Sequence, residues 1–169
     1  MPNQNLFVAL RDAFPSDLDS IAVETDDGLA YSWRDLDRAS AMVANLLQSL
    51  DIPKARDGVP PRVAVQVEKS VEAMVLYLAT LRAGFVFLPL NTAYTASEVE
   101  YFVGDAEPTV LLADPTKTET LAPIAARYGA ALRTLDAQGH GSFRDLCDAQ
   151  SDDIAIEPRD PRLRKLRGD

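Results

Sequence analysis

The chain has 169 residues, of which 47% are hydrophobic and 25% are charged, and these values are typical of one globular domain. The net charge is −9, but residues 159–169 carry five basic and two acidic side chains. Residues 1–158 therefore carry 12 basic and 24 acidic side chains, a net charge of −12. A body this acidic repels phosphate groups, so we expect no nucleic-acid partner.

The best candidate for a membrane span, residues 71–90, is interrupted by Glu72, Arg82, Gly84 and Pro89. A helix that crosses a bilayer needs about 20 predominantly apolar residues. The first residues show no basic stretch followed by an apolar run, which is the pattern of a secretory signal. We therefore expect a cytoplasmic protein without a membrane partner.

A helix and a hairpin are predicted near the N-terminus. Apolar residues recur at helical spacing over residues 6–14, and Pro15 closes that segment. Apolar residues alternate over residues 21–25, Asp27-Gly28 favours a tight turn, and residues 29–31 return. This order is typical of a β-hairpin.

A long amphipathic helix is predicted after the hairpin. Ser32 is a typical N-cap residue, and Asp35, three positions later, completes a carboxylate form of the capping box. The apolar residues that follow lie on one face of the predicted helix, at Leu36, Ala39, Val43, Leu46, Leu47 and Leu50. Residues 51–61 are polar and contain three prolines, so they are predicted to form a loop.

Strands and helices are predicted to alternate from residue 62 onward. The strands are expected at residues 62–67, 85–90, 109–113 and 131–135, and the helices at 71–83, 95–104, 118–128 and 142–149. Ser142 is a typical cap for the last helix. Alternation of this kind predicts an α/β fold, with a mainly parallel sheet flanked by helices and the N-terminal β-hairpin at one end.

The sequence shows no constellation of catalytic side chains. The eight glycines are scattered and form no phosphate-binding loop. His140, the only histidine, is predicted to lie in a flexible turn without a metal-ligating partner. Cys147, the only cysteine, is predicted to lie in the core and excludes an internal disulfide. The acidic pairs, Asp26-Asp27 and Asp152-Asp153, lie in segments that look exposed.

Two cationic side chains, Lys69 and Arg82, lie at positions where a cation can have a functional role. Lys69 follows a predicted strand, at the carboxyl end where open parallel sheets bind ligands, but a solvent-exposed residue at a helix start explains it as well. Arg82 lies in the last turn of its helix, where a cation complements the helix dipole. The pattern alone therefore assigns no catalytic residue, no cofactor-binding residue and no metal ligand.

One segment resembles a known family. Residues 81–95, LRAGFVFLPLNTAYT, are similar to the early core motif of the adenylate-forming (AMP-binding) enzymes. Residues 29–36, LAYSWRDL, are similar to the opening motif of that family. Within it, the segments at 68–80, 89–95 and 101–108 together resemble most the malonyl-CoA synthetase group of the acyl-CoA synthetases. The resemblance runs from about residue 6 to about residue 158.

The resemblance implies the N-terminal subdomain of a two-step ligase. Such a ligase joins ATP and a carboxylic acid into an acyl-adenylate and diphosphate, and CoA then displaces AMP to form a thioester. For the malonyl-CoA synthetases the acid is malonate. Complete relatives use ATP, Mg²⁺ and CoA, and no cofactor is expected for this chain by itself, because the family's phosphate loop lies after the position of Asp160.

Residues 1–158 are therefore expected to form an incomplete N-terminal AMP-binding domain, and residues 159–169 a divergent basic tail. A frameshift or a premature stop is a hypothesis for the tail, which the downstream DNA would test. We expect the isolated chain to be inactive. Three roles stay open: a part complemented by a second synthetase chain, a non-catalytic partner that regulates a synthetase, or a remnant. Unpaired strand edges also predict self-association.

Overall fold

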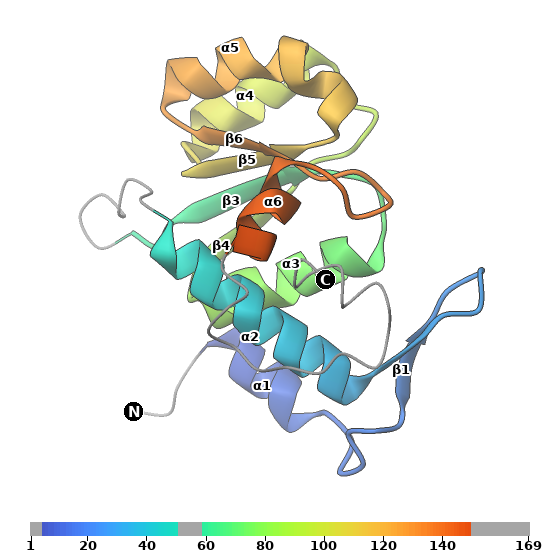
Figure 1. Cartoon of the computed structure of the whole chain (residues 1–169). Coiled ribbons are helices and arrows are strands. Elements are labelled where there is room, and N and C mark those ends of the chain that lie inside the picture. The colour runs from blue at the N-terminus through green and yellow to red at the C-terminus, as the bar shows by residue number, and fades with distance from the viewer. Residues whose placement is uncertain (1–4, 51–58, 150–169) are drawn as a thin grey trace.

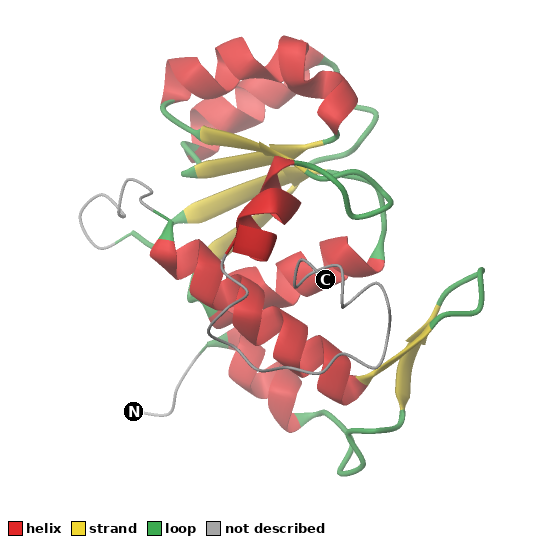
Figure 2. Cartoon of the chain, viewed as in Figure 1, coloured by secondary structure: helices red, strands yellow, loops and turns green. Residues whose placement is uncertain are grey.

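The computed structural model describes residues 5–50 and 59–149 (Figure 1). The basic tail expected at residues 159–169 lies outside the described residues, as do Asp152-Asp153 and most of the loop expected at 51–61. Helices and strands alternate along the described chain, as the sequence predicts (Figure 2).

Every helix and strand predicted from the sequence is present, with small shifts at the ends. The elements are α1 (Leu6–Asp12), β1 (Ile21–Glu24), β2 (Ala30–Ser32), α2 (Trp33–Ser49), β3 (Arg62–Gln66), α3 (Val71–Arg82), β4 (Val86–Pro89), α4 (Ala96–Ala106), β5 (Val110–Ala113), η2 (Pro115–Lys117), α5 (Thr118–Tyr128), β6 (Ala131–Thr134) and α6 (Ser142–Ala149). The sequence does not predict η2, a single 3₁₀ turn that Asp114 caps by accepting from the Thr116 N–H.

Four strands form a parallel sheet in the order β4-β3-β5-β6, so the expected α/β fold is confirmed. In register, Val63 of β3 lies between Phe87 of β4 and Val110 of β5. Parallel strands cannot be joined by a tight turn, and a helix connects each consecutive pair here. The helices cover both faces of the sheet, with α4 and α5 on one side and α2 and α3 on the other (Figure 1).

The two faces of the sheet bury different side chains, since successive residues of a strand point to opposite faces. Val63, Val65 and Leu112 pack on the side of α1, α2, α3 and α6. Ala64 and Leu111 pack on the side of α4 and α5. Because β3 and β5 are buried on both faces, their sequences are nearly continuous apolar runs.

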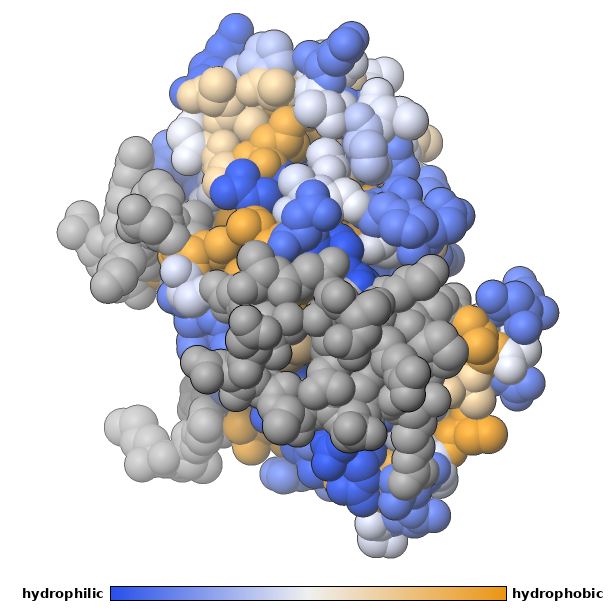
Figure 3. Space-filling view, in the orientation of Figure 1, coloured by the Kyte–Doolittle hydropathy of each residue, from blue (hydrophilic) through white to orange (hydrophobic). Residues whose placement is uncertain are grey.

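The hairpin stands apart from the four-stranded sheet. β1 and β2 pair antiparallel, with Glu24 opposite Ala30, and the register shifts between Ile21 and Val23. Ile21 is 64% exposed, and apolar surface is visible on the hairpin at the right of Figure 3. Ile21 and Glu24 of β1 are thus exposed, whereas Tyr31 of β2 is fully buried and joins the core.

The hairpin loop is longer than the tight turn that the sequence predicts at Asp27-Gly28. The Thr25 N–H donates to the Leu29 carbonyl at 2.9 Å, so residues 26–28 connect the bonded pair. Gly28 has φ +81°, in the left-handed region where a three-residue hairpin loop places its glycine.

Two helix ends differ from the prediction. α4 continues past Gly104 to Ala106, and Glu107 ends it in the left-handed conformation just before Pro108. Ser142 is the first residue of α6 and not its cap, because its hydroxyl accepts from the Thr134 N–H of β6 at 3.0 Å. This bond holds the start of α6 against the edge of β6.

Candidate functional site at the carboxyl edge of the sheet

The strand order identifies the edge of the sheet where a ligand would bind. α3 leads away from β3 toward β4 on one face, whereas α5 leads away from β5 toward β6 on the other face. β3 and β5 are neighbours, so the chain leaves this pair in opposite directions. Open α/β sheets bind ligands outside the carboxyl ends of such a pair. The candidate site comprises the segments that follow β3, β4 and β5.

Gln66 ends β3 at this edge and is 1% exposed. Its Nε2 donates to the carbonyl oxygens of Asn91 at 2.8 Å and Tyr94 at 3.3 Å, both in the loop that follows β4. Its Oε1 is buried and accepts no hydrogen bond from the residues that the structure describes. Because burying an amide without partners is unfavourable, the two bonds to the loop offset part of that cost.

Other side chains hold the same loop. Lys117 Nζ in η2 donates to the Thr92 carbonyl at 2.6 Å. Asn91 Oδ1 accepts from the Ala93 N–H at 2.9 Å within the loop. Tyr94 stacks on Phe102 of α4, with ring centroids 5.2 Å apart. Side chains from β3, η2 and α4 therefore fix the loop at residues 91–95.

The carboxylates at this edge cap helices. The Thr95 N–H and hydroxyl donate to the Glu98 carboxylate at 2.8 and 2.7 Å, and these bonds lower the pKa of Glu98. The Thr116 hydroxyl and N–H donate to the Asp114 carboxylate and lower the pKa of Asp114 in the same way. A general acid at neutral pH needs a raised pKa, so neither group fits that role.

Of three residues singled out in the sequence, Lys69 and His140 are exposed and Cys147 lies in the core. Lys69 is exposed in the turn after β3. His140 is also exposed, and its Nδ1 lies 3.4 Å from Asp136 Oδ2. Cys147 is 2% exposed among the apolar residues of the core, so its prediction as a core residue is confirmed.

Arg82 does more than complement a helix dipole. Its Nη1 lies 2.8 Å from Asp37 Oδ1, and the guanidinium carbon lies 4.7 Å from the centroid of the Phe7 ring. Arg11 pairs with Asp37 Oδ2 at 3.1 Å. Because these residues come from α1, α2 and α3, the arginine of the motif at 81–95 anchors three helices to one another.

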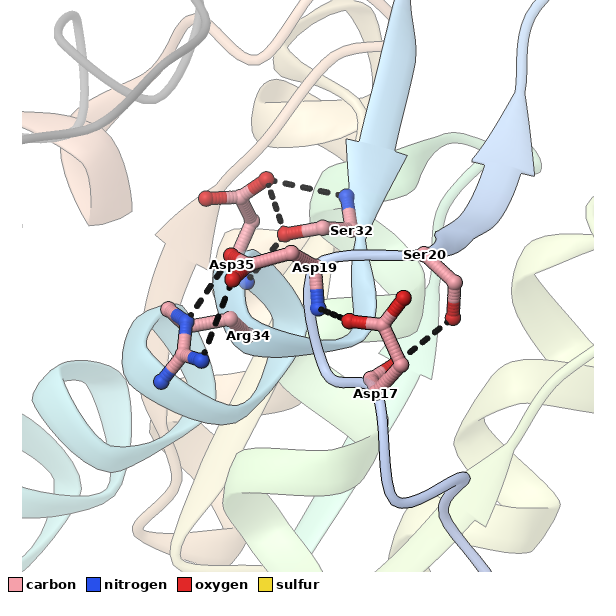
Figure 4. A network of polar contacts seen from close by, with 6 residues as sticks. All are labelled: Asp17, Asp19, Ser20, Ser32, Arg34 and Asp35. Atoms are coloured by element: carbon pink, nitrogen blue, oxygen red, sulfur yellow. Dashed lines mark hydrogen bonds and ion pairs between the residues drawn. The ribbon is translucent and has the colours of Figure 1, made fainter.

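A second polar network lies at the base of the hairpin (Figure 4). The Asp35 carboxylate accepts from the Ser32 N–H at 2.9 Å and from its hydroxyl at 2.7 Å, which confirms the predicted capping box. Arg34 Nε lies 3.0 Å from Asp19 Oδ1, and Asp17 Oδ1 accepts from the Asp19 N–H. These contacts orient the segment before β1 against the first turn of α2.

The chemical inventory of the described chain is limited. Over residues 5–50 and 59–149, no three histidine, cysteine, aspartate or glutamate residues gather in a way that could hold a metal ion. None of the helices in these ranges is both long and apolar enough to cross a bilayer. At the candidate site, the side chains of Gln66, Lys117, Glu98 and Asp114 are engaged in holding the loop and capping helices.

Sequence reasoning missed Gln66 and Lys117. Gln66 interrupts the otherwise apolar residues 63–67, and a polar side chain inside a strand predicted to be buried is a usable signal for a buried hydrogen-bond donor. Lys117 gave no such signal, because it lies between a strand and a helix in a segment with no apolar periodicity.

Comparisons with known proteins agree with this fold. The model of a family described as AMP-binding enzyme matches residues 11–162. The crystal structure of apo MatB from Rhodopseudomonas palustris, a malonyl-CoA synthetase, is similar with a TM-score of 0.78 and 45% sequence identity. The similarity covers 92% of this chain and 30% of MatB.

Two curated relatives match shorter parts of the chain. The probable CoA ligase CCL9 of Humulus lupulus is 35% identical over 95 residues, which are 56% of this chain and 18% of the ligase. FR901469 synthetase of Dothideomycetidae sp. is 37% identical over 102 residues, which are 60% of this chain and 1% of the synthetase. The chain thus spans less than a third of MatB and a smaller share of each curated relative.

Proposed function

The chain belongs to the AMP-binding enzymes, and we propose that it is the N-terminal portion of an AMP-forming acid–CoA ligase whose acid is malonate. The observation that supports malonate is the 45% identity with MatB over 92% of this chain. The complete ligase would convert ATP, malonate and CoA into malonyl-CoA, AMP and diphosphate through an acyl-adenylate. A cytoplasmic location is part of the proposal, supported by the single cysteine.

In this proposal the described residues are scaffold. Gln66 and Lys117 fix the loop at 91–95 beside the carboxyl ends of the strands. The sequence has no glycine-rich phosphate loop, so the groups that hold the ATP phosphates are expected in the remainder of the ligase. We expect the isolated chain not to form an acyl-adenylate.

Diphosphate exchange into ATP, driven by malonate, tests the proposal. The assay compares the purified chain with a chimera in which the matched part of this chain replaces the corresponding part of MatB. We expect no exchange above the blank for the chain and malonate-dependent exchange for the chimera. MatB is the positive control, and methylmalonate and acetate test which acid is accepted.

Two results would contradict the proposal. Exchange by the purified chain alone would show that a site for the chemistry exists within its 169 residues. A chimera that is folded by circular dichroism but shows no exchange would show that this segment is not a competent N-terminal portion of such a ligase.

A non-catalytic pairing module is the second candidate function. The observation that favours it is that β4 is an outer strand of the four-stranded sheet. A tagged chain co-expressed with a full-length synthetase would then capture it and change its rate. Capture without any change in rate would argue against a regulatory role.

A further inference from the structure

The two outer strands of the four-stranded sheet, β4 and β6, present their backbones in different ways. Along a strand, successive residues direct their backbone groups to alternate sides, so every second residue of an outer strand faces away from the sheet. In β6, the N–H groups of Ala131 and Leu135 donate to β5. Leu132 and Thr134 therefore face outward.

Two outward backbone groups of β6, the Leu132 carbonyl and the Thr134 N–H, have side-chain partners. Arg133 Nη1 donates to the Leu132 carbonyl at 2.8 Å. The Thr134 N–H donates to Ser142 Oγ at 3.0 Å, and the Ser142 N–H donates back to Thr134 Oγ1 at 2.9 Å. A charged side chain and the start of α6 thus close this edge, in the way that natural sheets block further strand pairing.

Among the residues that the structure describes, no side chain donates to or accepts from the outward backbone groups of β4. The N–H groups of Val86 and Leu90 donate to the segment of β3, at 2.8 Å each, so Phe87 and Pro89 face outward. Within the described residues, neither the N–H nor the carbonyl of Phe87 makes a hydrogen bond outside the sheet. β4 carries no charged side chain, and Val86 is 42% exposed.

We propose that the β4 edge docks one strand of a partner chain that carries the remainder of an adenylate-forming fold. The inference rests on the proposed function and on the match to only 30% of MatB, which leaves most of such a fold to be supplied. The Phe87 N–H and the carbonyls of Phe87 and Pro89 are the groups that the added strand would meet.

A second copy of this chain fits the same edge less well. Pro89 has no N–H, so each copy would offer only the Phe87 N–H as an outward donor of β4. Two paired copies would leave half of the outward carbonyls of β4 without a donor from the partner strand. A strand of different sequence has no such restriction, and its own N–H groups can donate to both carbonyls.

Hydrogen exchange at single backbone amides tests the docking edge without relying on activity. The Phe87 amide is measured in the free chain and in the MatB chimera, with the Thr134 amide as the internal control. We expect exchange at Phe87 to slow by at least about tenfold in the chimera, because a new bond protects it. Thr134 should change by less than about twofold, because Ser142 already protects it.

Two matched variants test the edge in separate chains. The tagged chain is co-expressed with the part of MatB that it does not cover, and the captured amount of that part is measured. V86K places a charge on the β4 edge, whereas M74K places the same charge on α3 at nearly equal exposure, 42% against 41%. We expect V86K to lower the captured amount by about tenfold and M74K by less than about twofold.

The outcomes separate this inference from the proposed function. Slowed exchange at Phe87 in a chimera that lacks ligase activity would support the docking edge and count against the function. Unchanged exchange at Phe87 in an active chimera would overturn the docking edge and leave the function standing. A free chain that is already dimeric, with Phe87 protected, would also overturn it in favour of a second copy.

Discussion

The four-stranded sheet and the hairpin are built from strands of similar length, three to five residues, but they differ in burial. Val63 and Leu111 in the inner strands are fully buried, whereas Ile21 in β1 is 64% exposed. The residue types are alike, so strand propensity does not explain the difference. What differs is that helices cover both faces of the larger sheet, whereas the described part of the hairpin packs on α2 through Tyr31 and leaves Ile21 exposed.

The hairpin is held chiefly where it meets α2. Tyr31 is fully buried at the end of β2, and Ser32 caps the helix that follows. The exposed part of the hairpin and its buried base thus have different roles. Substitutions in the four-stranded sheet and in the hairpin test this difference.

The largest effect is expected in the inner strands. Leu112→Ala in β5 removes a fully buried side chain, and we expect the free energy of unfolding to fall by about 2–5 kcal/mol. Ile21→Ala in β1 should change it by less than about 0.5 kcal/mol. Urea unfolding followed by circular dichroism measures both. Similar losses for the two variants would remove the distinction between the sheets.

A smaller effect is expected at the base of the hairpin. Ser32→Ala removes the side chain that caps α2 and bonds to Asp35, so we expect a loss of about 1 kcal/mol. Ser32→Asp keeps an N-cap acceptor and serves as the control in the same unfolding experiment. If both variants unfold like the unchanged chain, the base does not stabilise the hairpin junction.

Two aspartates allow a matched comparison of ion pairs. Asp37→Asn weakens contacts to both Arg11 and Arg82 and should cost about 1 kcal/mol. Asp19→Asn, near the hairpin, weakens the more exposed pair with Arg34 and should cost less than about 0.5 kcal/mol. Thermal unfolding at low and high salt measures the two losses, and a larger loss for Asp19→Asn would contradict the ranking.

The smallest effect is expected in the pH dependence of Tm, through Glu98 at the start of α4. Bonds from Thr95 lower the pKa of Glu98 in the folded chain. The stabilisation is therefore complete above the unfolded pKa of about 4.3 and is lost as the pH falls through the lower folded pKa. Glu98→Gln should therefore flatten the fall in Tm below about pH 4.3. An unchanged fall in the Glu98 variant would be evidence against this cap.

The sequence predicts the order of elements well because each one has a local signal. Ser32 with Asp35 and Thr95 with Glu98 start α2 and α4, and both capping boxes are confirmed. The burial of β3 follows from its apolar run. Such signals are read within a few residues, so no tertiary information is needed.

The contacts of the candidate site could not be predicted in the same way. Gln66 bonds to a loop 25 to 28 positions away, and Arg82 meets Asp37 across 45 positions. Spacings of this size have no periodicity that a single sequence reveals. The resemblance at 81–95 identified the family, but not that its arginine joins three helices.

Gly141 allows the turn before α6 to lie close against β6. It has φ +135°, and a Cβ built there would lie 2.3 Å from the Thr134 carbonyl oxygen. Any side chain at this position would push the turn before α6 away from β6, and the bonds between Ser142 and Thr134 would be lost. The Thr134 N–H of β6 would then be open to a further strand, as the Phe87 N–H of β4 is within the described residues.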